Sequence, residues 1–173
     1  MDGFMNFTQM KNEVLRFEGL SLKPYFCPAG KLTIGVGRNL EDNGITQQEA
    51  MQMLQNDLER CWQELQDHIP FLMQLPQEAR EILLHMCYNL GIHKLLGFKR
   101  TLAHLQQGNF ELAAQEMLDS RWAKQVGNRA EVLATRMGRL QGYHLQVKEL
   151  LVEMQGQLSQ LERQIGHSFA KLS

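Results

Sequence analysis

Three residues near the start of the chain, Glu18, Cys27 and Thr33, have the types and the spacing for acid catalysis. Glu18 lies between apolar residues and directly before Gly19, where a helix is expected to end. A carboxyl there faces the negative end of the helix dipole and has apolar neighbours, and both effects favour its protonated form. A carboxyl that keeps its proton near neutral pH meets the requirement for a general acid. The more ordinary interpretation of Glu18 alone is a surface glutamate at a helix end.

The two other residues follow at fixed spacing: eight residues separate Glu18 from Cys27, and five separate Cys27 from Thr33. A thiol with a pKa of about 8.5 is mostly neutral at pH 7, so it gives little electrostatic help to a cationic transition state. It can still hydrogen-bond weakly to a water molecule. The alternative is that Cys27 is a small, half-buried apolar residue. Cys61 and Cys87 fall on apolar helical faces and are expected in the core.

The elements that must position these residues are a helix and a small sheet. Thr8 is suited to cap a helix that ends at Gly19. Two β-prone runs, 25–27 and 32–36, flank the turn signal at 28–30 and predict a β-hairpin.

The remainder of the chain is expected to be helical. Thr46 and Glu49 form a capping box that opens a long helix, which ends at Pro70 at the latest. Apolar periodicity predicts further helices at 77–90, at 98–107, at 110–118 and from about Asn128 onward. The predicted fold class is α+β: a small β-containing lobe and a larger helical lobe, joined by the long helix.

The C-terminal segment has a different pattern. Its apolar positions step by four and three residues, as in a heptad repeat that only Ser168 breaks; they are Val147, Leu151, Met154, Leu158, Leu161, Ile165 and Leu172. We therefore predict a domain at 1–143 and a helical tail at 144–173. Packing of the tail on its own domain and self-association as a coiled coil both remain open. A membrane-surface helix is less favoured because the polar face is not basic.

Composition narrows the function classes. The 173 residues carry 18 basic and 19 acidic side chains, a formal net charge of −1, which argues against a protein that coats nucleic acid. The sequence lacks the run of about 18 apolar residues that stable membrane insertion requires. The three cysteines cannot form a complete disulfide set and indicate a reducing compartment. The histidines have no ligand spacing, so neither a metal nor a cofactor is expected.

The motif Glu18-x8-Cys27-x5-Thr33, followed by a glycine-rich strand, resembles the signature of the phage-type lysozymes, the endolysins of glycoside hydrolase family 24. Other segments match that family in order along the chain from about Val14 to Arg139. They are Gly44-Ile45-Thr46, Asn56-Asp57-Leu58, Tyr88-Asn89-Leu90-Gly91, Gly97-Phe98-Lys99-Arg100-Thr101-Leu102, Ser120-Arg121-Trp122 and Asn128-Arg129-Ala130.

This resemblance implies a two-lobed, lysozyme-like muramidase that cleaves the β-1,4 bond between N-acetylmuramic acid and N-acetylglucosamine in peptidoglycan. Glu18 is implied to be the general acid of an inverting hydrolysis, in which Cys27 and Thr33 hold the attacking water. The residues implied to line the sugar cleft are Gly37, Tyr88, Asn89, Thr101 and Glu116. Glu116 departs from the uncharged amide that is commoner in the family.

Supporting roles are implied for three charged residues. Arg129 matches an arginine that lies close to the catalytic glutamate, and Arg38 and Asp57 match a charged pair that links the β-lobe to the long helix. The expected partners are glycan strands of peptidoglycan. The N-terminus lacks the basic and apolar regions of an export signal, so synthesis in a host bacterial cytoplasm is expected, followed by release to the cell wall.

Two alternatives remain open at this stage. A lytic transglycosylase needs only one carboxyl and forms a 1,6-anhydro product. A catalytically weak module that binds the wall or a partner would keep the same scaffold and use the helical tail for interaction.

Overall fold

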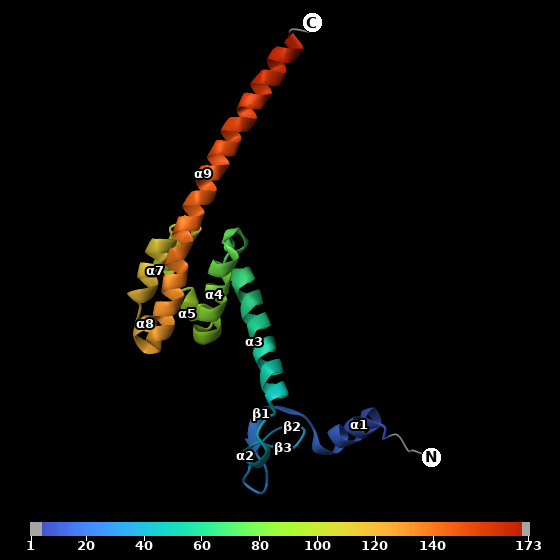
Figure 1. The fold of residues 1–173 in the computed structure, drawn as a ribbon. Helices are drawn as coiled ribbons and strands as arrows, with labels where there is room; N and C mark the ends of the chain where they lie inside the picture. Colours follow the sequence, from blue (N-terminus) through green and yellow to red (C-terminus); the bar gives the residue numbers. More distant parts are fainter. Residues whose placement is uncertain (1–4, 171–173) are drawn as a thin grey trace. The chain divides into compact units, whose positions relative to one another are not determined.

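The computed structural model describes residues 5–170, without the side chains of residue 164 and residues 166–170. The chain divides into two units, Met1–Gln55 and Asn56–Ser173 (Figure 1). The long helix α3 (Gln47–His68) contributes residues to both. Strands and helices are both present, which confirms the predicted α+β class.

The first unit begins with α1 (Phe7–Glu18). Its N-cap is Asn6, whose side chain accepts a hydrogen bond from the backbone N–H of Gln9 at 3.0 Å. The expectation that Thr8 caps this helix is therefore wrong, because an asparagine two residues earlier already satisfies a free amide of the first turn. The helix ends at Gly19 as expected, with a positive φ of 72°.

A three-stranded antiparallel sheet follows, in the order β1 (Ser21–Phe26), β2 (Leu32–Gly35) and β3 (Arg38–Asn39). The predicted hairpin is present as β1 and β2, with Tyr25 opposite Thr33. The third strand was not predicted, because two residues are too few to form a period-two pattern. It pairs Asn39 with Thr33, so β2 is the central strand and Thr33 has a neighbour on each side.

The start of α3 follows the short helix α2 (Leu40–Asn43). The predicted capping box is present: the Thr46 hydroxyl accepts from the Glu49 backbone N–H at 3.2 Å, and the Glu49 carboxylate accepts from the Thr46 backbone N–H at 2.7 Å. Each residue therefore satisfies an unpaired backbone amide of the other.

All regular elements among the described residues of the second unit are helices. After α3 it contains η1 (Leu72–Gln74), α4 (Gln77–Leu90), α5 (Ile92–Leu95), α6 (Lys99–Gln106), α7 (Phe110–Leu118), α8 (Arg121–Val126) and α9 (Asn128–Ala170). The predictions for 77–90 and 110–118 match α4 and α7 at both ends. The six-residue helix α8 was not predicted, because it is too short to show helical periodicity.

The hydrophobic core of this unit gathers side chains from α3 through α9. Cys61 and Cys87 are buried in it, as predicted. Trp122 of α8 is also buried, with its ring edge-on to Phe98 at 6.1 Å between centroids. These contacts explain why the tryptophan behaves as a core residue.

Helix α9 is continuous from the core into the predicted tail, as Figure 1 shows in orange to red. Its first part packs against α7, and Met137 and Leu140 are buried there. From Val147 to Ile165 its large apolar residues are exposed. The heptad position Leu172 lies outside the described residues, as does the side chain of Ser168. The division of the chain at residue 143 stays a prediction.

Over the part of the chain that the structure describes, no helix combines the length with the apolar character that crossing a membrane requires.

Candidate active site

The Glu18 carboxyl lies against the turn that joins β2 to β3. Glu18 is the last residue of α1, and a Cβ added to Gly37 would lie 3.1 Å from its Oε2 atom. Gly37 also has a positive φ of 71°, which disfavours other residues. Because Gly37 has no side chain, the Glu18 carboxyl can approach the main chain. The positive φ is a second, independent reason for glycine at this position.

A tight turn surrounds Cys27. Its backbone N–H donates to the Lys31 carbonyl at 3.0 Å, and its carbonyl accepts from Gly30 at 2.8 Å. Hydrogen bonds from the backbone of Lys31 and then of Ala29 lower the pKa of the half-buried Cys27 thiol, and the Thr33 hydroxyl lowers it further. This differs from the ordinary thiol pKa assumed from the sequence, because donors contributed by the turn stabilise the thiolate.

Thr33 is the buried polar residue of the central strand. Its hydroxyl donates to the Lys31 carbonyl at 3.0 Å and lies within hydrogen-bonding reach of the Cys27 thiol. The structure therefore brings Cys27 and Thr33 together at one end of the sheet. A thiol and a hydroxyl side by side can hydrogen-bond to the same water molecule.

The two residues expected to form a charged pair have other partners. Arg38 donates to the Gly44 carbonyl at 2.9 Å and pairs with the Glu49 carboxylate. Asp57 pairs with Arg60, three residues further along α3, at 2.8 Å. Arg38 therefore connects β3 with the start of α3 through Glu49. The pairing of Arg38 with Asp57 stays a prediction.

The Glu49 carboxylate is held by three groups. Hydrogen bonds from the backbone N–H and then the hydroxyl of Thr46 lower its pKa, and the charge of Arg38 lowers it further. The carboxylate therefore stabilises both the start of α3 and the attachment of β3.

In the second unit, two predicted cleft residues share a cavity of about 800 Å³ that is lined mainly by α6 and α8. Thr101 lies on α6 and is buried. Glu116 lies on α7 and pairs with Arg100 at 2.6 Å. This ion pair was missed from the sequence, because its members lie sixteen positions apart on different helices.

The other predicted residues of this unit lie at helix ends. Asn89, in the last turn of α4, accepts a hydrogen bond from Trp122 Nε1 at 2.8 Å, and the tryptophan lines the cavity. Tyr88 is exposed beside it. Arg129 is exposed in the first turn of α9. The roles of Tyr88 and Asn89 in sugar binding, and of Arg129 close to the catalytic glutamate, stay predictions.

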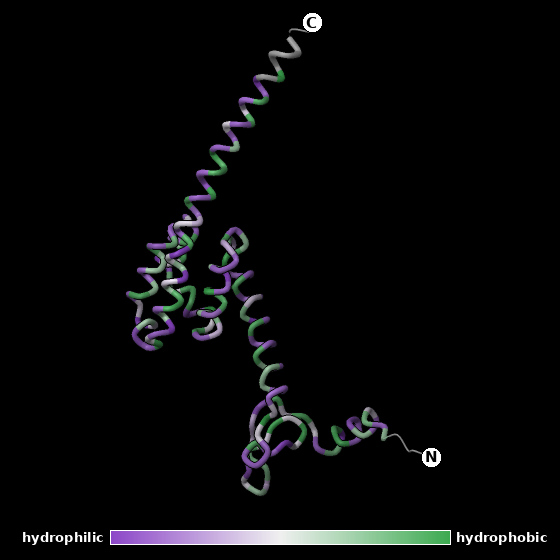
Figure 2. The backbone as a smooth tube through the Cα atoms, viewed as in Figure 1, coloured by the Kyte–Doolittle hydropathy of each residue, from purple (hydrophilic) through white to green (hydrophobic). Residues whose placement is uncertain are grey.

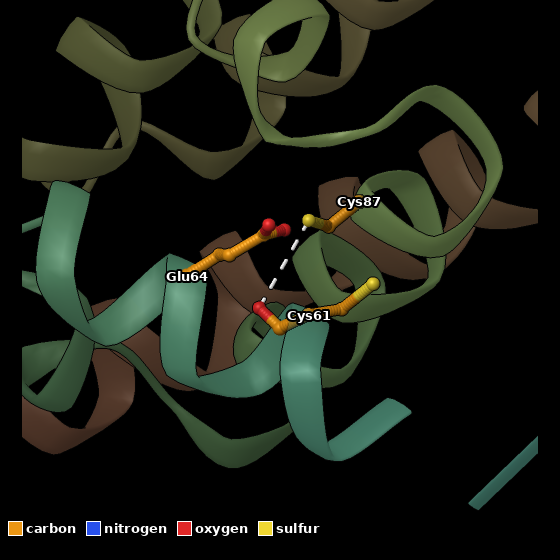
Figure 3. A group of neighbouring side chains, drawn as sticks. All are labelled: Cys61, Glu64 and Cys87. Atoms are coloured by element: carbon orange, nitrogen blue, oxygen red, sulfur yellow. Dashed lines mark hydrogen bonds between the residues drawn. The ribbon is translucent and has the colours of Figure 1, made fainter. Parts of the chain in front are cut away.

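Cys61, Glu64 and Cys87 form a cluster whose potential ligand atoms lie within 4.8 Å of one another (Figure 3). The Cys87 thiol donates weakly to the Cys61 carbonyl at 3.9 Å, and burial raises its pKa to about 12. Both cysteines are buried among the apolar side chains of the core, so we interpret the cluster as a core contact.

Taken together, these features define an α+β protein with a carboxyl, a thiol and a hydroxyl on a small sheet unit, and a cavity on a separate helical unit. The model of the phage lysozyme family matches residues 15–139. That range covers most of the chain and includes Glu18, Cys27 and Thr33. The chain belongs to the phage lysozyme family.

Two relatives illustrate this membership. The pre-baseplate central spike protein Gp5 of Enterobacteria phage T4 is 26% identical over 169 residues, which cover 80% of this chain and 29% of that protein. An endolysin of Acyrthosiphon pisum secondary endosymbiont phage 1 is 30% identical over 115 residues, which cover 64% of this chain and 75% of the endolysin. The chain thus spans under a third of the spike protein and three quarters of the endolysin.

Proposed function

We propose that this protein is a peptidoglycan hydrolase that cleaves the β-1,4 bond between N-acetylmuramic acid and N-acetylglucosamine. The observation that carries the proposal is the family match over residues 15–139, which includes the Glu18-Cys27-Thr33 motif at the expected spacing. Its natural substrate is then the glycan strand of the bacterial cell wall.

Glu18 is the general acid in this mechanism. It protonates the glycosidic oxygen as the bond to the leaving sugar breaks, which avoids expulsion of an alkoxide. Its position supports the role, because the carboxyl lies at the end of α1 beside the bare backbone of Gly37. A general acid gains from such fixed placement, because productive geometry is part of the catalytic effect.

The attacking water lies on the opposite face of the sugar, and its attack inverts the anomeric centre. Thr33 and Cys27 hold this water through the hydroxyl and the thiol. The closeness of the Cys27 thiol to the Thr33 hydroxyl supports the assignment, because the two groups can hydrogen-bond to the same water molecule. We expect Cys27→Ala to remain folded and to lose part of the activity.

The cavity of the helical unit binds sugars of the glycan strand. Its lining includes Thr101 and Glu116 as hydrogen-bonding groups. Basic side chains outnumber acidic ones in the lining. That balance suits the carboxylates of muramic acid and its peptide stems.

The test is the turnover of isolated peptidoglycan by the full chain and by Glu18→Gln, with muropeptide products identified by mass spectrometry. The variant keeps the shape of Glu18 but has no proton to donate at neutral pH. We expect its rate to fall at least about a hundredfold, with an unchanged circular dichroism spectrum. Glu13→Gln, which removes an exposed carboxyl from the same helix, should keep the full rate.

Three results would contradict the proposal. Undiminished turnover by Glu18→Gln would show that Glu18 is not the general acid. Products lighter by one water would identify a lytic transglycosylase instead of a hydrolase. Retention of glycan without any cleavage by the unmodified protein would identify a binding module.

A further inference from the structure

The apolar face of α9 continues past the core at unchanged spacing. Met137 and Leu140 are buried beneath the rest of the unit, and the same steps of three and four residues lead to six further apolar positions. These six are 51% to 63% exposed, and we call them the seam: Val147, Leu151, Met154, Leu158, Leu161 and Ile165. Figure 2 shows hydrophobic and hydrophilic residues alternating along this part of the helix.

The seam has the side-chain arrangement of a coiled-coil surface. Leu151, Met154, Leu158 and Leu161 line one groove along the helix, with a volume of about 360 Å³, and Gln155 and Gln157 complete its lining. In a heptad repeat with Leu151 and Leu158 at position a, these glutamines occupy positions e and g, which flank the apolar seam. The groove accepts side chains from a facing helix of the same kind.

We propose that the seam binds the seam of a second copy of this chain, as an antiparallel two-stranded coiled coil. In that orientation Val147 faces Ile165 of the second copy, Leu151 faces Leu161, and Met154 faces Leu158. Every layer of the contact is then apolar on both sides, and the six layers repeat about one twofold axis.

Charge complementarity selects the antiparallel orientation. Reversing one helix brings position e opposite position e, so Lys148 of each copy meets Glu162 of the other. In a parallel pair, position g meets position e instead, and the facing residues are Leu150 with Gln155 and Gln157 with Glu162. Only the antiparallel pairing gives opposite charges at these flanking positions.

The base of the helix supports the same orientation. Just before the seam, the His144 ring packs edge-on against Phe110 at 5.4 Å, and Leu140 is buried. This face of α9 is therefore already covered by its own unit. A parallel partner would bring a second helical unit to that same end, whereas an antiparallel partner places the two units at opposite ends.

The area is sufficient for a weak dimer. Burying a leucine-sized side chain removes about 60–120 Å² of apolar surface from water, so the twelve seam side chains of two copies remove roughly 700–1,400 Å². Specific interfaces begin at about 1,000 Å². We therefore expect dissociation in the micromolar range.

The polar residues favour a second copy over a lipid surface. From residue 148 to residue 163 the helix carries the basic residues Lys148 and Arg163 and the acidic residues Glu149, Glu153 and Glu162. This balance gives no attraction to anionic lipid, which a membrane-surface helix normally needs.

The first test is sedimentation velocity of the full chain over a range of concentrations. The unmodified protein should show a monomer–dimer equilibrium, and Leu158→Glu should weaken the dimer at least about a hundredfold, because it places two carboxylates in adjacent central layers. Gln160→Glu adds the same charge outside the seam and should leave the dissociation constant unchanged. A monomer at all concentrations, a higher oligomer, or equal effects of the two variants would overturn the proposal.

The second test addresses orientation through charge reversal. Lys148→Glu and Glu162→Lys should each weaken the dimer, and the double variant should restore it, because both contacts are then reversed together. We expect each single change to raise the dissociation constant about tenfold. Simple addition of the two effects without rescue would overturn the antiparallel pairing. Sedimentation of a monomer with anionic vesicles would assign the seam to a lipid surface instead.

Discussion

At the scale of single residues, the arrangement of Glu18 depends on a residue that has no side chain. Gly37 lets the carboxyl lie against the turn between β2 and β3, and its positive φ is one that other residues adopt only with strain. A neighbouring glycine provides a matched comparison. Gly35 has a similar φ of 69°, but an added Cβ there would meet nothing within 4 Å.

We therefore predict that Gly37→Ala lowers peptidoglycan turnover and that Gly35→Ala does not. Both variants carry the same backbone strain and should lose about 1 kcal/mol of stability. Only the Gly37 variant places a methyl group in tight contact with the Glu18 carboxyl. Thermal unfolding measures the loss of stability, which both variants should share. Initial rates of peptidoglycan turnover measure the loss of activity, which only Gly37→Ala should show. Equal losses of activity in the two variants would show that strain alone, and not the contact with Glu18, is responsible.

At the scale of elements, the start of α3 combines a cap with an ion pair. Thr46 and Arg38 both bind the Glu49 carboxylate, and together they lower its pKa below its ordinary value of 4.5. A depressed pKa in the folded state means that the contribution to stability is present above the ordinary pKa. It is lost as the pH falls through the lowered value.

We predict that Glu49→Gln destabilises the protein at neutral pH and that this difference disappears in acid. The variant retains a hydrogen-bonding side chain but lacks the charge that Arg38 and the Thr46 amide stabilise. Urea denaturation from neutral pH down to below the carboxyl pKa measures the difference. Glu13→Gln, at an exposed position of α1, is the control. If the difference in unfolding free energy between Glu49→Gln and the unmodified protein stays constant with pH, ionisation of this carboxylate does not contribute to stability.

At the scale of the whole molecule, the inferred dimer would carry two copies of the proposed catalytic site. On a polymer with repeating bonds, a second attached site raises the effective concentration and slows release. This consequence rests on the proposed function. A second site should strengthen binding to an insoluble wall, which can engage both copies. It should not change the turnover of a short glycan, which can engage only one.

Leu158→Glu should therefore release from insoluble peptidoglycan at least about tenfold more readily than the unmodified protein. Its turnover of short soluble glycans should be unchanged, because the substitution lies outside the proposed site. Co-sedimentation with purified walls gives the first quantity, and product analysis gives the second. Gln160→Glu should match the unmodified protein in both. Equal retention of the two variants would show that the seam plays no part in wall binding.

The sequence by itself determined the features that adjacent residues encode. The spacing of Glu18, Cys27 and Thr33, the capping box at Thr46 and Glu49, and the ends of α4 and α7 could all be predicted. A helix end or a turn is decided by hydrogen bonds within a few residues, so its signal is local. The heptad spacing of α9 was visible for the same reason, as was the α+β class.

Only the tertiary structure decided what depends on distant residues. The approach of Gly37 to Glu18, the donors that lower the pKa of Cys27, and the pairing of Glu116 with Arg100 join segments that the sequence does not place together. The pairing of Arg38 with Glu49 was not predicted, because its members lie on different elements, the sheet and the start of α3. Local pattern selects the residues, whereas the packing of separate elements sets their distances, and both pKa values and ion pairs depend on those distances.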